Sequence, residues 1–199
     1  MNKIVKMAIF LVALTATSSF AGYGFRAGFG LYDYSSGDRE LDAYKIKMGY
    51  GYGGGLVTIA PLTSILSFVS ELSFFYRKPM ILSTSKNGYK EEMYLTEISM
   101  SVPLMFQLAI TKSVPYLTAG VQLDSPISPK LTRIVDGEKE TRDANGRTSM
   151  DFGFVLGFGY LITQNVGVDA RAVIGFTSPI KDLDDSKWNQ YVVGLTYYF

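Results

Sequence analysis

The amino-acid sequence predicts an all-β protein, an eight-stranded antiparallel up-and-down barrel of the transmembrane, outer-membrane type. Three observations predict it. Eight segments alternate between apolar residues and polar residues or glycine, which is the period of a β-strand. All nine charged residues of these segments fall on the face opposite the bulky apolar side chains. Long and short connections alternate along the chain, as they do in outer-membrane barrels.

The eight segments follow the same rule in order along the chain. They are residues 23–32, 44–53, 66–77, 97–108, 116–123, 151–160, 166–176 and 190–199. The apolar residues occupy the odd positions in 23–32, 116–123 and 190–199, and the even positions in the other five segments.

The composition excludes several classes of protein. The chain has 199 residues with no Cys and no His, so disulfide scaffolds, thiol nucleophiles, histidine-dependent triads and the usual zinc sites are excluded. The 19 Lys and Arg residues nearly balance the 18 Asp and Glu residues, which argues against nucleic-acid binding. A hydrophobic fraction of 47% is too high for a disordered chain.

Residues 1–21 have the pattern of a secretory signal peptide. Lys3 and Lys6 precede an apolar run over 7–14, and Ser19 and Ala21 place small residues at the −3 and −1 positions of a cleavage site. The run is too short to cross about 30 Å of hydrocarbon as a helix. We therefore predict a signal peptide over 1–21 and a single barrel domain over 22–199.

The charged face of the strands is predicted to line the barrel interior. Eight strands leave an interior just wide enough for side chains, so the bulky apolar face must point outward, where it requires a bilayer. The inward charges are Arg26, Lys45, Lys47, Glu71, Arg77, Glu97, Asp151, Asp169 and Arg171. Buried charges must find partners, so we expect a structural network of ion pairs in this lumen.

Pairing in this network follows in part from sequence position. Asp169 and Arg171 share a face two residues apart and are expected to pair, with the two glutamates facing Arg26 or Lys45. A proton relay or an ion path along these charges is the functional alternative. We predict no catalytic residue and no metal site. The glycine-rich run over 49–54 has the spacing of a dinucleotide fingerprint but lies within a strand, so we predict no cofactor.

The long connections are expected over 34–43, 78–92, 124–149 and 177–189, and the short ones near 60–64, 111–114 and 162–165. With the N-terminus in the periplasm, every long connection lies outside the cell. The loop 124–149 is the best candidate for contact with a partner protein, a host surface or a polysaccharide, or else it is a solvated, variable loop. Pro103 is expected to cause a bulge or irregularity, and Trp188 to lie in an outer aromatic girdle or anchor a loop.

The last six residues of the chain include Gly194, Tyr197 and the terminal Phe199. This arrangement of a glycine, alternating aromatic residues and a terminal Phe resembles the signal that the barrel-assembly machinery reads in outer-membrane proteins. The resemblance implies that this machinery is a partner during insertion.

Three stretches carry a resemblance to a known family. They are Val102–Phe106 leading to Pro115–Gly120, Asp151–Tyr160, and Val168–Arg171 before Gly175–Thr177. They resemble the outer-membrane β-barrel domain family that includes the PorT-like proteins. The family's usual carboxylate before the Ile-Pro-Leu stretch is Ser101 in this chain. The resemblance implies a barrel in the outer membrane of a Gram-negative-type cell, and some PorT-like proteins belong to protein secretion machinery.

The prediction is therefore a non-enzymatic integral outer-membrane barrel with a structural or loop-mediated surface-interaction role. The alternatives are a PorT-like subunit of a secretion or envelope assembly, an outer-membrane enzyme, and a soluble lipocalin-like ligand-binding barrel. The known outer-membrane enzymes depend on histidine, which this chain lacks. The lipid bilayer is the expected surrounding of the strands.

Overall fold

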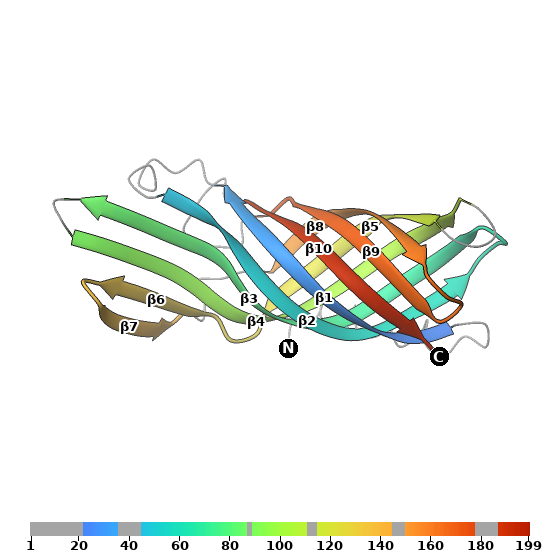
Figure 1. Cartoon of the computed structure of the whole chain (residues 1–199), viewed down its shortest axis with the longest axis horizontal. Helices are drawn as coiled ribbons and strands as arrows, with labels where there is room; N and C mark the ends of the chain where they lie inside the picture. Colours follow the sequence, from blue (N-terminus) through green and yellow to red (C-terminus); the bar gives the residue numbers. More distant parts are fainter. Residues whose placement is uncertain (1–21, 36–44, 87–88, 111–114, 145–149, 178–186) are drawn as a thin grey trace.

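Eight antiparallel strands close into a barrel in the computed structural model, which describes residues 22–35, 45–86, 89–110, 115–144, 150–177 and 187–199 (Figure 1). The barrel strands are β1 (Gly22–Ser35), β2 (Lys45–Pro61), β3 (Leu66–Lys86), β4 (Tyr89–Ala109), β5 (Pro115–Pro126), β8 (Asp151–Leu161), β9 (Val166–Gly175) and β10 (Lys187–Tyr198). Pairing of β1 with β10 closes the cylinder, and pairing of β4 with β5 and of β5 with β8 completes it. The predicted fold class is confirmed.

Three short turns lie at one end of the barrel, which we call the turn end. A backbone N–H closes each turn: Leu62 to Leu66, Ile110 to Pro115 and Ile162 to Val166. The chain also ends here, where the Phe199 N–H donates to the Tyr23 carbonyl at 2.8 Å. We call the opposite end the hairpin end.

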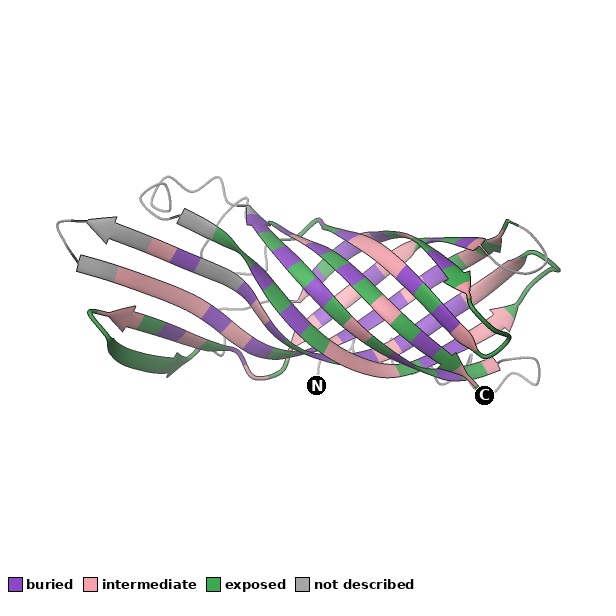
Figure 2. Ribbon diagram, viewed as in Figure 1, coloured by how far each residue is buried: buried purple, intermediate pink, exposed green. Residues whose placement is uncertain are grey.

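The bulky apolar side chains face outward, as predicted. Phe29 is 46% exposed and Phe158 is 65% exposed, whereas Arg26 is only 3% exposed. Figure 2 shows the resulting alternation of buried and exposed residues, which is clearest along β1, β8 and β10. This arrangement contradicts the soluble lipocalin-like alternative, in which the aromatic residues would fill the centre.

The predicted loop over 78–92 is wrong, because β3 and β4 continue through most of it as a long hairpin. The two strands stay paired from Ile81 and Tyr94 out to Lys86 and Tyr89. Figure 1 shows this hairpin projecting beyond the closed part of the barrel. Apolar alternation in the sequence stops before this part of the hairpin, so the sequence pattern ended before the strands did.

The predicted structureless loop over 124–149 is also wrong. It contains the hairpin of β6 (Lys130–Val135) and β7 (Glu138–Asp143), and β6 pairs with the projecting part of β4. Asp136 and Gly137 have φ values of 50° and 90°, which a tight two-residue hairpin turn requires. The strands β3, β4, β6 and β7 therefore form a sheet outside the barrel, which we call the outer sheet.

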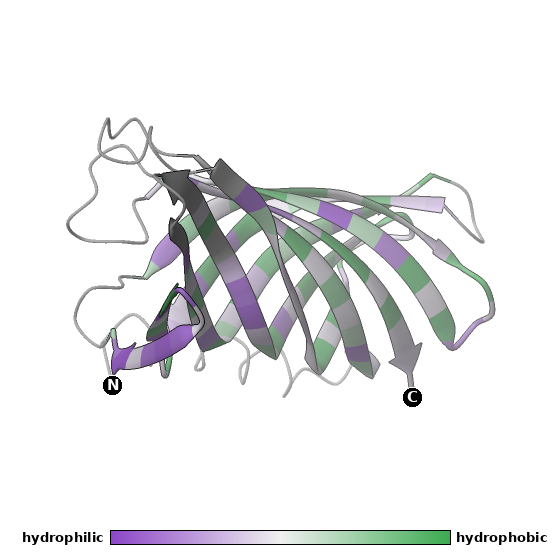
Figure 3. Cartoon of the chain, turned by 60° about the vertical axis from the view of Figure 1, so that its left-hand side comes forward, coloured by the Kyte–Doolittle hydropathy of each residue, from purple (hydrophilic) through white to green (hydrophobic). Residues whose placement is uncertain are grey.

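Figure 3 shows that hydrophilic residues gather on the β6–β7 hairpin, whereas the barrel strands alternate in hydropathy. All six residues of β7 are exposed. The exposed surface of the β6–β7 hairpin is thus hydrophilic, whereas the outer surface of the barrel wall is apolar.

A local irregularity lies at Pro103, as expected: the β3–β4 ladder lacks pairs at Val102 and Pro103, although its register is the same on both sides. The β4–β5 register passes through Pro103 unchanged, opposite Gln122. The bulge itself lies elsewhere, because the β3–β4 register shifts between Arg77 and Ile81, around the buried Pro79. This bulge inserts one residue at the level where the barrel ends and the outer sheet begins, and bulges commonly redirect strands at barrel rims.

The predicted signal peptide over 1–21 lies outside the described residues, as do most of the predicted connections 34–43 and 177–189. Within the part of the chain that the structure describes, no helix is both long and apolar enough to cross a membrane.

Introducing a charge on the lipid-facing surface tests the outward assignment. Leu156 lies in the middle of β8 and is 48% exposed. We expect Leu156→Arg to reduce the free energy of unfolding by about 2–4 kcal/mol, because an arginine near the bilayer midplane loses its hydration. Urea titration in phospholipid vesicles measures this loss. The control Glu138→Arg, on exposed β7, should change stability by less than about 0.5 kcal/mol, and equal effects of the two variants would contradict the assignment.

Candidate functional site

The barrel interior contains a compact ion-pair group near the turn end. Arg26 binds Asp169 through two hydrogen bonds, Nη2 to Oδ1 at 2.6 Å and Nε to Oδ2 at 3.1 Å. Arg171 lies 2.8 Å from Asp169 and 2.7 Å from Glu71. Two arginines and two carboxylates thus balance one another, and all four side chains are buried. Paired geometry of this kind offsets the large free-energy cost of removing the charges from water.

Strand register makes room for this group. Gly194 on β10 pairs with both Gly28 and Asp169, so it lies directly beside the group. A Cβ atom at position 194 would overlap the guanidinium of Arg26. A side chain at this point would push Arg26 away from Asp169, so Gly194 is needed for close approach.

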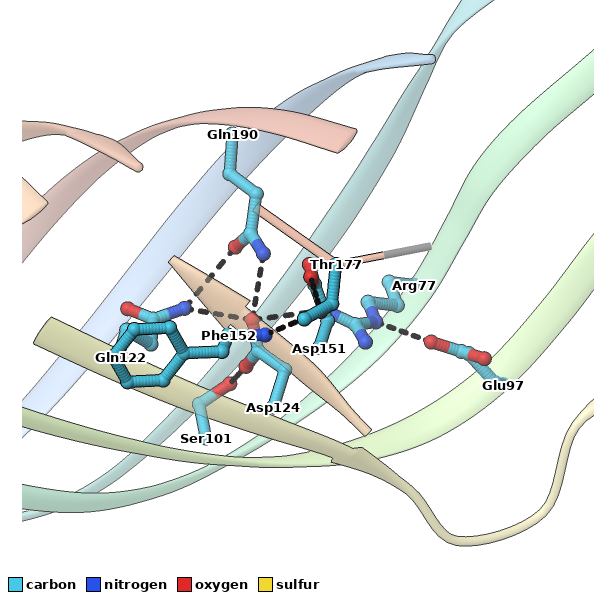
Figure 4. A network of polar contacts seen from close by, with 9 residues as sticks. All are labelled: Arg77, Glu97, Ser101, Gln122, Asp124, Asp151, Phe152, Thr177 and Gln190. Carbon is cyan, nitrogen blue, oxygen red and sulfur yellow. Dashed lines mark hydrogen bonds and ion pairs between the residues drawn. The ribbon is translucent and has the colours of Figure 1, made fainter. Parts of the chain in front are cut away.

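A second polar network lies nearer the hairpin end and is centred on Asp124 (Figure 4). Its Oδ1 accepts a hydrogen bond from Ser101, and its Oδ2 accepts bonds from Gln122 at 2.9 Å and Gln190 at 2.6 Å. The Arg77 guanidinium lies 3.5 Å away and compensates its charge. Residues from β3, β4, β5 and β10 therefore meet across the lumen.

Arg77 connects this network to two aromatic side chains, Tyr32 and Trp188. Its Nε binds Glu97, the residue opposite it in the β3–β4 register. Its guanidinium carbon lies 5.7 Å from the Tyr32 ring centroid and 5.3 Å from the Trp188 ring centroid. Both distances are within the range of a cation–π interaction. The fully buried cation is thus stabilised by carboxylates and by ring faces.

An apolar cluster closes the hairpin end of the interior. Its buried members are Tyr34, Leu82, Leu95, Ala144 and Trp188. Ala144 follows β7, so the outer hairpin contributes to this closure. Trp188 is 1% exposed, so its predicted place in an outer girdle is wrong, whereas its place in one cluster with Ala144 agrees with the alternative of a loop anchor.

Little free volume remains between the two polar groups. A cavity of about 20 Å³ lies among Arg26, Glu71, Gln122 and Gln190. That volume holds about one water molecule. The described interior is therefore packed with polar side chains and with a buried apolar cluster that includes Val57, Met105 and Val155, and a wide aqueous channel would not fit within it.

The residues predicted to form the lumen charge network fall into three groups in the structure: buried, exposed and outside the description. Buried inside the barrel are Arg26, Glu71, Arg77, Glu97, Asp151, Asp169 and Arg171. Lys47 is exposed, so its predicted place in the buried network is wrong, and the side chain of Lys45 lies outside what the structure describes. Lys47 shares the inward parity but lies near the hairpin end of β2, where the strand leaves the packed interior.

The predicted pairing is right for Asp169 with Arg171 and wrong for the two glutamates. Glu71 contacts Arg171, and Glu97 contacts Arg77. Asp151 accepts a hydrogen bond from the Thr177 hydroxyl at 2.8 Å. Pairing across a barrel depends on the height of each residue along the axis, which alternation alone does not give.

Sequence reasoning placed Gln190 on the inward face but missed Asp124 and Trp188 as members of the interior. Asp124 was placed in a loop, although it continues the inward parity of Tyr116, Thr118, Gly120 and Gln122. Trp188 similarly continues the inward parity of Gln190 on β10. Both residues would have been predicted to face inward if each strand had been continued with the same odd–even alternation past its last apolar residue.

The remaining predicted site residues lie on β10 and at the chain end. Gly194 faces the interior beside Arg26, whereas Tyr197 is 51% exposed and Phe199 is 76% exposed. Among the described residues, no group of three or more Asp, Glu, His or Cys side chains is placed to hold a metal ion.

The outer sheet offers a separate, exposed surface. Arg133 on β6 binds Glu91 on β4 at 2.6 Å, and the Thr132 and Thr141 hydroxyls share a hydrogen bond of 3.1 Å across the hairpin. Arg142 and Glu140 form an ion pair of 2.6 Å along β7. These contacts attach the hairpin to β4 and leave its charged face in solvent.

Removing one interior charge tests the balance of the ion-pair group. Arg171→Met leaves Glu71 buried without a cation, so we expect a loss of about 3–5 kcal/mol of unfolding free energy. The matched control Arg142→Met breaks an exposed pair and should cost at most about 1 kcal/mol. Urea unfolding in vesicles measures both, and the double variant Arg171→Met with Glu71→Met should regain part of the loss. Equal stability of Arg171→Met and wild type would contradict the compensation.

Comparison with known proteins agrees with this architecture. Neisserial surface protein A is 15% identical, with a TM-score of 0.54, over 90% of this chain and 99% of its own. Ail, the attachment invasion locus protein of Yersinia pestis, is 16% identical, with a TM-score of 0.50, over 90% of this chain and 99% of its own. No curated protein sequence matches the chain.

A family model described as an outer membrane protein beta-barrel domain matches residues 15–181, which is most of the chain. The structure agrees, since its lipid-facing surface is apolar and its charges are enclosed. The turn end is the periplasmic end, because outer-membrane barrels have short periplasmic turns. The chain therefore belongs to the outer-membrane β-barrel domain family and spans the outer membrane as an eight-stranded barrel.

Proposed function

We propose that this protein is a non-enzymatic outer-membrane barrel whose function is performed by the outer sheet, through contact with molecules outside the cell. The observation that supports the proposal is the contrast between a filled interior and a projecting, exposed sheet. β3 and β4 continue as a hairpin past Ser83, the last residue of β3 that pairs with β2, and β6 and β7 widen the sheet they form.

The interior is poorly suited to binding or catalysis. Each of its three buried arginines already lies against a carboxylate, in the pairs Arg26–Asp169, Arg171–Glu71 and Arg77–Glu97. A cavity of about 20 Å³ admits no substrate larger than water. A chain of groups that exchanges protons would also need partners that change charge readily, whereas arginine stays protonated. The charge network is therefore proposed to be structural.

The outer sheet has the properties of an interaction surface. It is attached to the barrel strands, because β6 pairs with β4 over six residues and Ala144 is buried in the apolar cluster at the hairpin end. Its exposed face carries charges of both signs, including Arg142 and Glu140. Functional residues are commonly carried on such projections from a rigid scaffold.

The C-terminal strand has a separate proposed role during insertion. Tyr197 and Phe199 project outward in contact, with ring centroids 5.7 Å apart. We include in the proposal that the barrel-assembly machinery reads these residues, with Gly194, as its insertion signal.

Removing the hairpin tests the proposed function. A variant with residues 128–143 replaced by a short Gly-Ser linker should keep the heat-modifiable gel mobility of a folded barrel, because the eight barrel strands remain. Cells displaying this variant and wild type at equal density are compared for adhesion to polysaccharide, to matrix proteins and to one another. We expect the deletion to abolish at least one of these. Unchanged adhesion in all three would contradict the proposal.

A second candidate is a PorT-like subunit of a secretion or envelope assembly, supported by the sequence resemblance and by a sheet large enough to dock a partner. Extraction of native membranes in mild detergent, followed by affinity purification, separates the two candidates. A stoichiometric envelope complex that depends on the hairpin favours the assembly subunit. Recovery of the barrel alone is expected if the surface role is correct.

A further inference from the structure

We propose that the free edge of β7 pairs with β7 of a second copy of this chain in an opposing membrane. The inference names a partner for the outer sheet and therefore rests on the proposed function above. Closure removes the edges of the barrel, but in the described part of the chain β7 is the last strand of the outer sheet. An exposed strand edge presents unpaired N–H and C=O groups that can accept another strand.

The hairpin geometry determines which backbone groups face this edge. In a two-residue hairpin the closing residues, Val135 and Glu138, exchange hydrogen bonds, and the pattern then alternates. Glu138, Glu140 and Arg142 therefore direct their backbone groups toward β6. The backbone groups directed toward the free edge belong to Lys139, Thr141 and Asp143.

One antiparallel register uses all three free-edge residues of both copies. It places Thr141 opposite Thr141 on a two-fold axis, and Lys139 opposite Asp143 on each side. A shift by one residue would pair edge-directed groups with groups that already face β6. A shift by two residues would leave one edge residue of each copy outside the hydrogen-bonded pairs.

The side chains favour the same register. Lys139 of each copy faces Asp143 of the other, and Glu140 of each copy faces Arg142 of the other, which makes four opposite-charge pairs across the two strands. Opposite charges and paired threonines directly across a strand pair are stabilising. The sequence Glu138–Asp143 is thus self-complementary in the register that its backbone selects.

The axis of this pairing determines how the two copies are oriented. The two-fold axis of an antiparallel pair is perpendicular to the sheet and reverses the strand direction. Figure 1 shows β6 and β7 running close to the long axis of the molecule, beyond the barrel. The two-fold rotation therefore reverses the long axis of the second copy, and its barrel points in the opposite direction. The two copies must then lie in apposed membranes. The contact would therefore join two cells.

Cysteine cross-linking tests the register, since the chain contains no other Cys. Opposed Cα atoms in a hydrogen-bonded pair are about 5.5 Å apart, within the range that a disulfide spans. On oxidation in detergent, Thr141→Cys should form a covalent dimer. Lys139→Cys and Asp143→Cys should cross-link when mixed and remain monomeric alone. The matched control Glu138→Cys, on the same exposed strand, should not cross-link with itself.

Charge variants test the energetics and the orientation. Lys139 faces the neutral Ile134 within its own hairpin, so Lys139→Glu should spare the fold. It should weaken clustering of vesicles carrying the protein by roughly tenfold, because two attractive contacts become repulsive. Mixing vesicles that carry Lys139→Glu with vesicles that carry Asp143→Lys should restore clustering. Heat-modifiable gel mobility verifies that each variant is folded.

The outcomes distinguish this inference from the proposed function. Absence of the Thr141→Cys dimer, or equal cross-linking of Glu138→Cys, would overturn the pairing. Dimers in detergent without vesicle clustering would overturn the apposed-membrane arrangement. If either occurs while the hairpin deletion still abolishes adhesion to polysaccharide or matrix proteins, the proposed function stands and the partner is another molecule.

Discussion

Each backbone N–H and C=O group that crosses the bilayer must be hydrogen-bonded within the protein, because hydrocarbon offers no partner. For strands this requirement is met only when the sheet closes, and here β1 and β10 complete the closure. Closing a sheet of eight strands leaves an interior only as wide as its side chains. The charged residues enclosed there must then satisfy one another, so the ion pairs of the lumen follow from the closure itself.

The interior meets this requirement with two networks of ion pairs and hydrogen bonds rather than with an apolar core alone. Arg26, Glu71, Asp169 and Arg171 form one, and Asp124 receives four neighbours in the other. The wall is shaped to fit them, since Gly194 leaves space for the Arg26 guanidinium. A barrel packed in this way is stable and specific in its register, but it has little room for a substrate or a conducting path.

The requirement ends where the membrane ends, and the architecture changes there. A bulge near Pro79 separates the closed barrel from the outer sheet. Beyond it, β3 and β4 continue in water, where exposed backbone groups can bind solvent and a sheet can have an edge. The β6–β7 hairpin adds to that sheet and leaves a charged strand at its margin. The part of the chain that is free of the membrane constraint is thus the part available for recognition.

The sequence alone determined the fold class, the outward face and the membership of most interior charges. A period of two, read from residues such as Phe29 and Arg26, is a local property of a strand between lipid and a narrow lumen. It did not reveal β6, β7 or the ends of β3 and β4, because strands in water need no apolar alternation. Nor did it pair Glu71 with Arg171, or bring Asp124 together with Gln190. Those contacts depend on strand tilt and on the height of each residue in the closed cylinder, which only the tertiary structure decides.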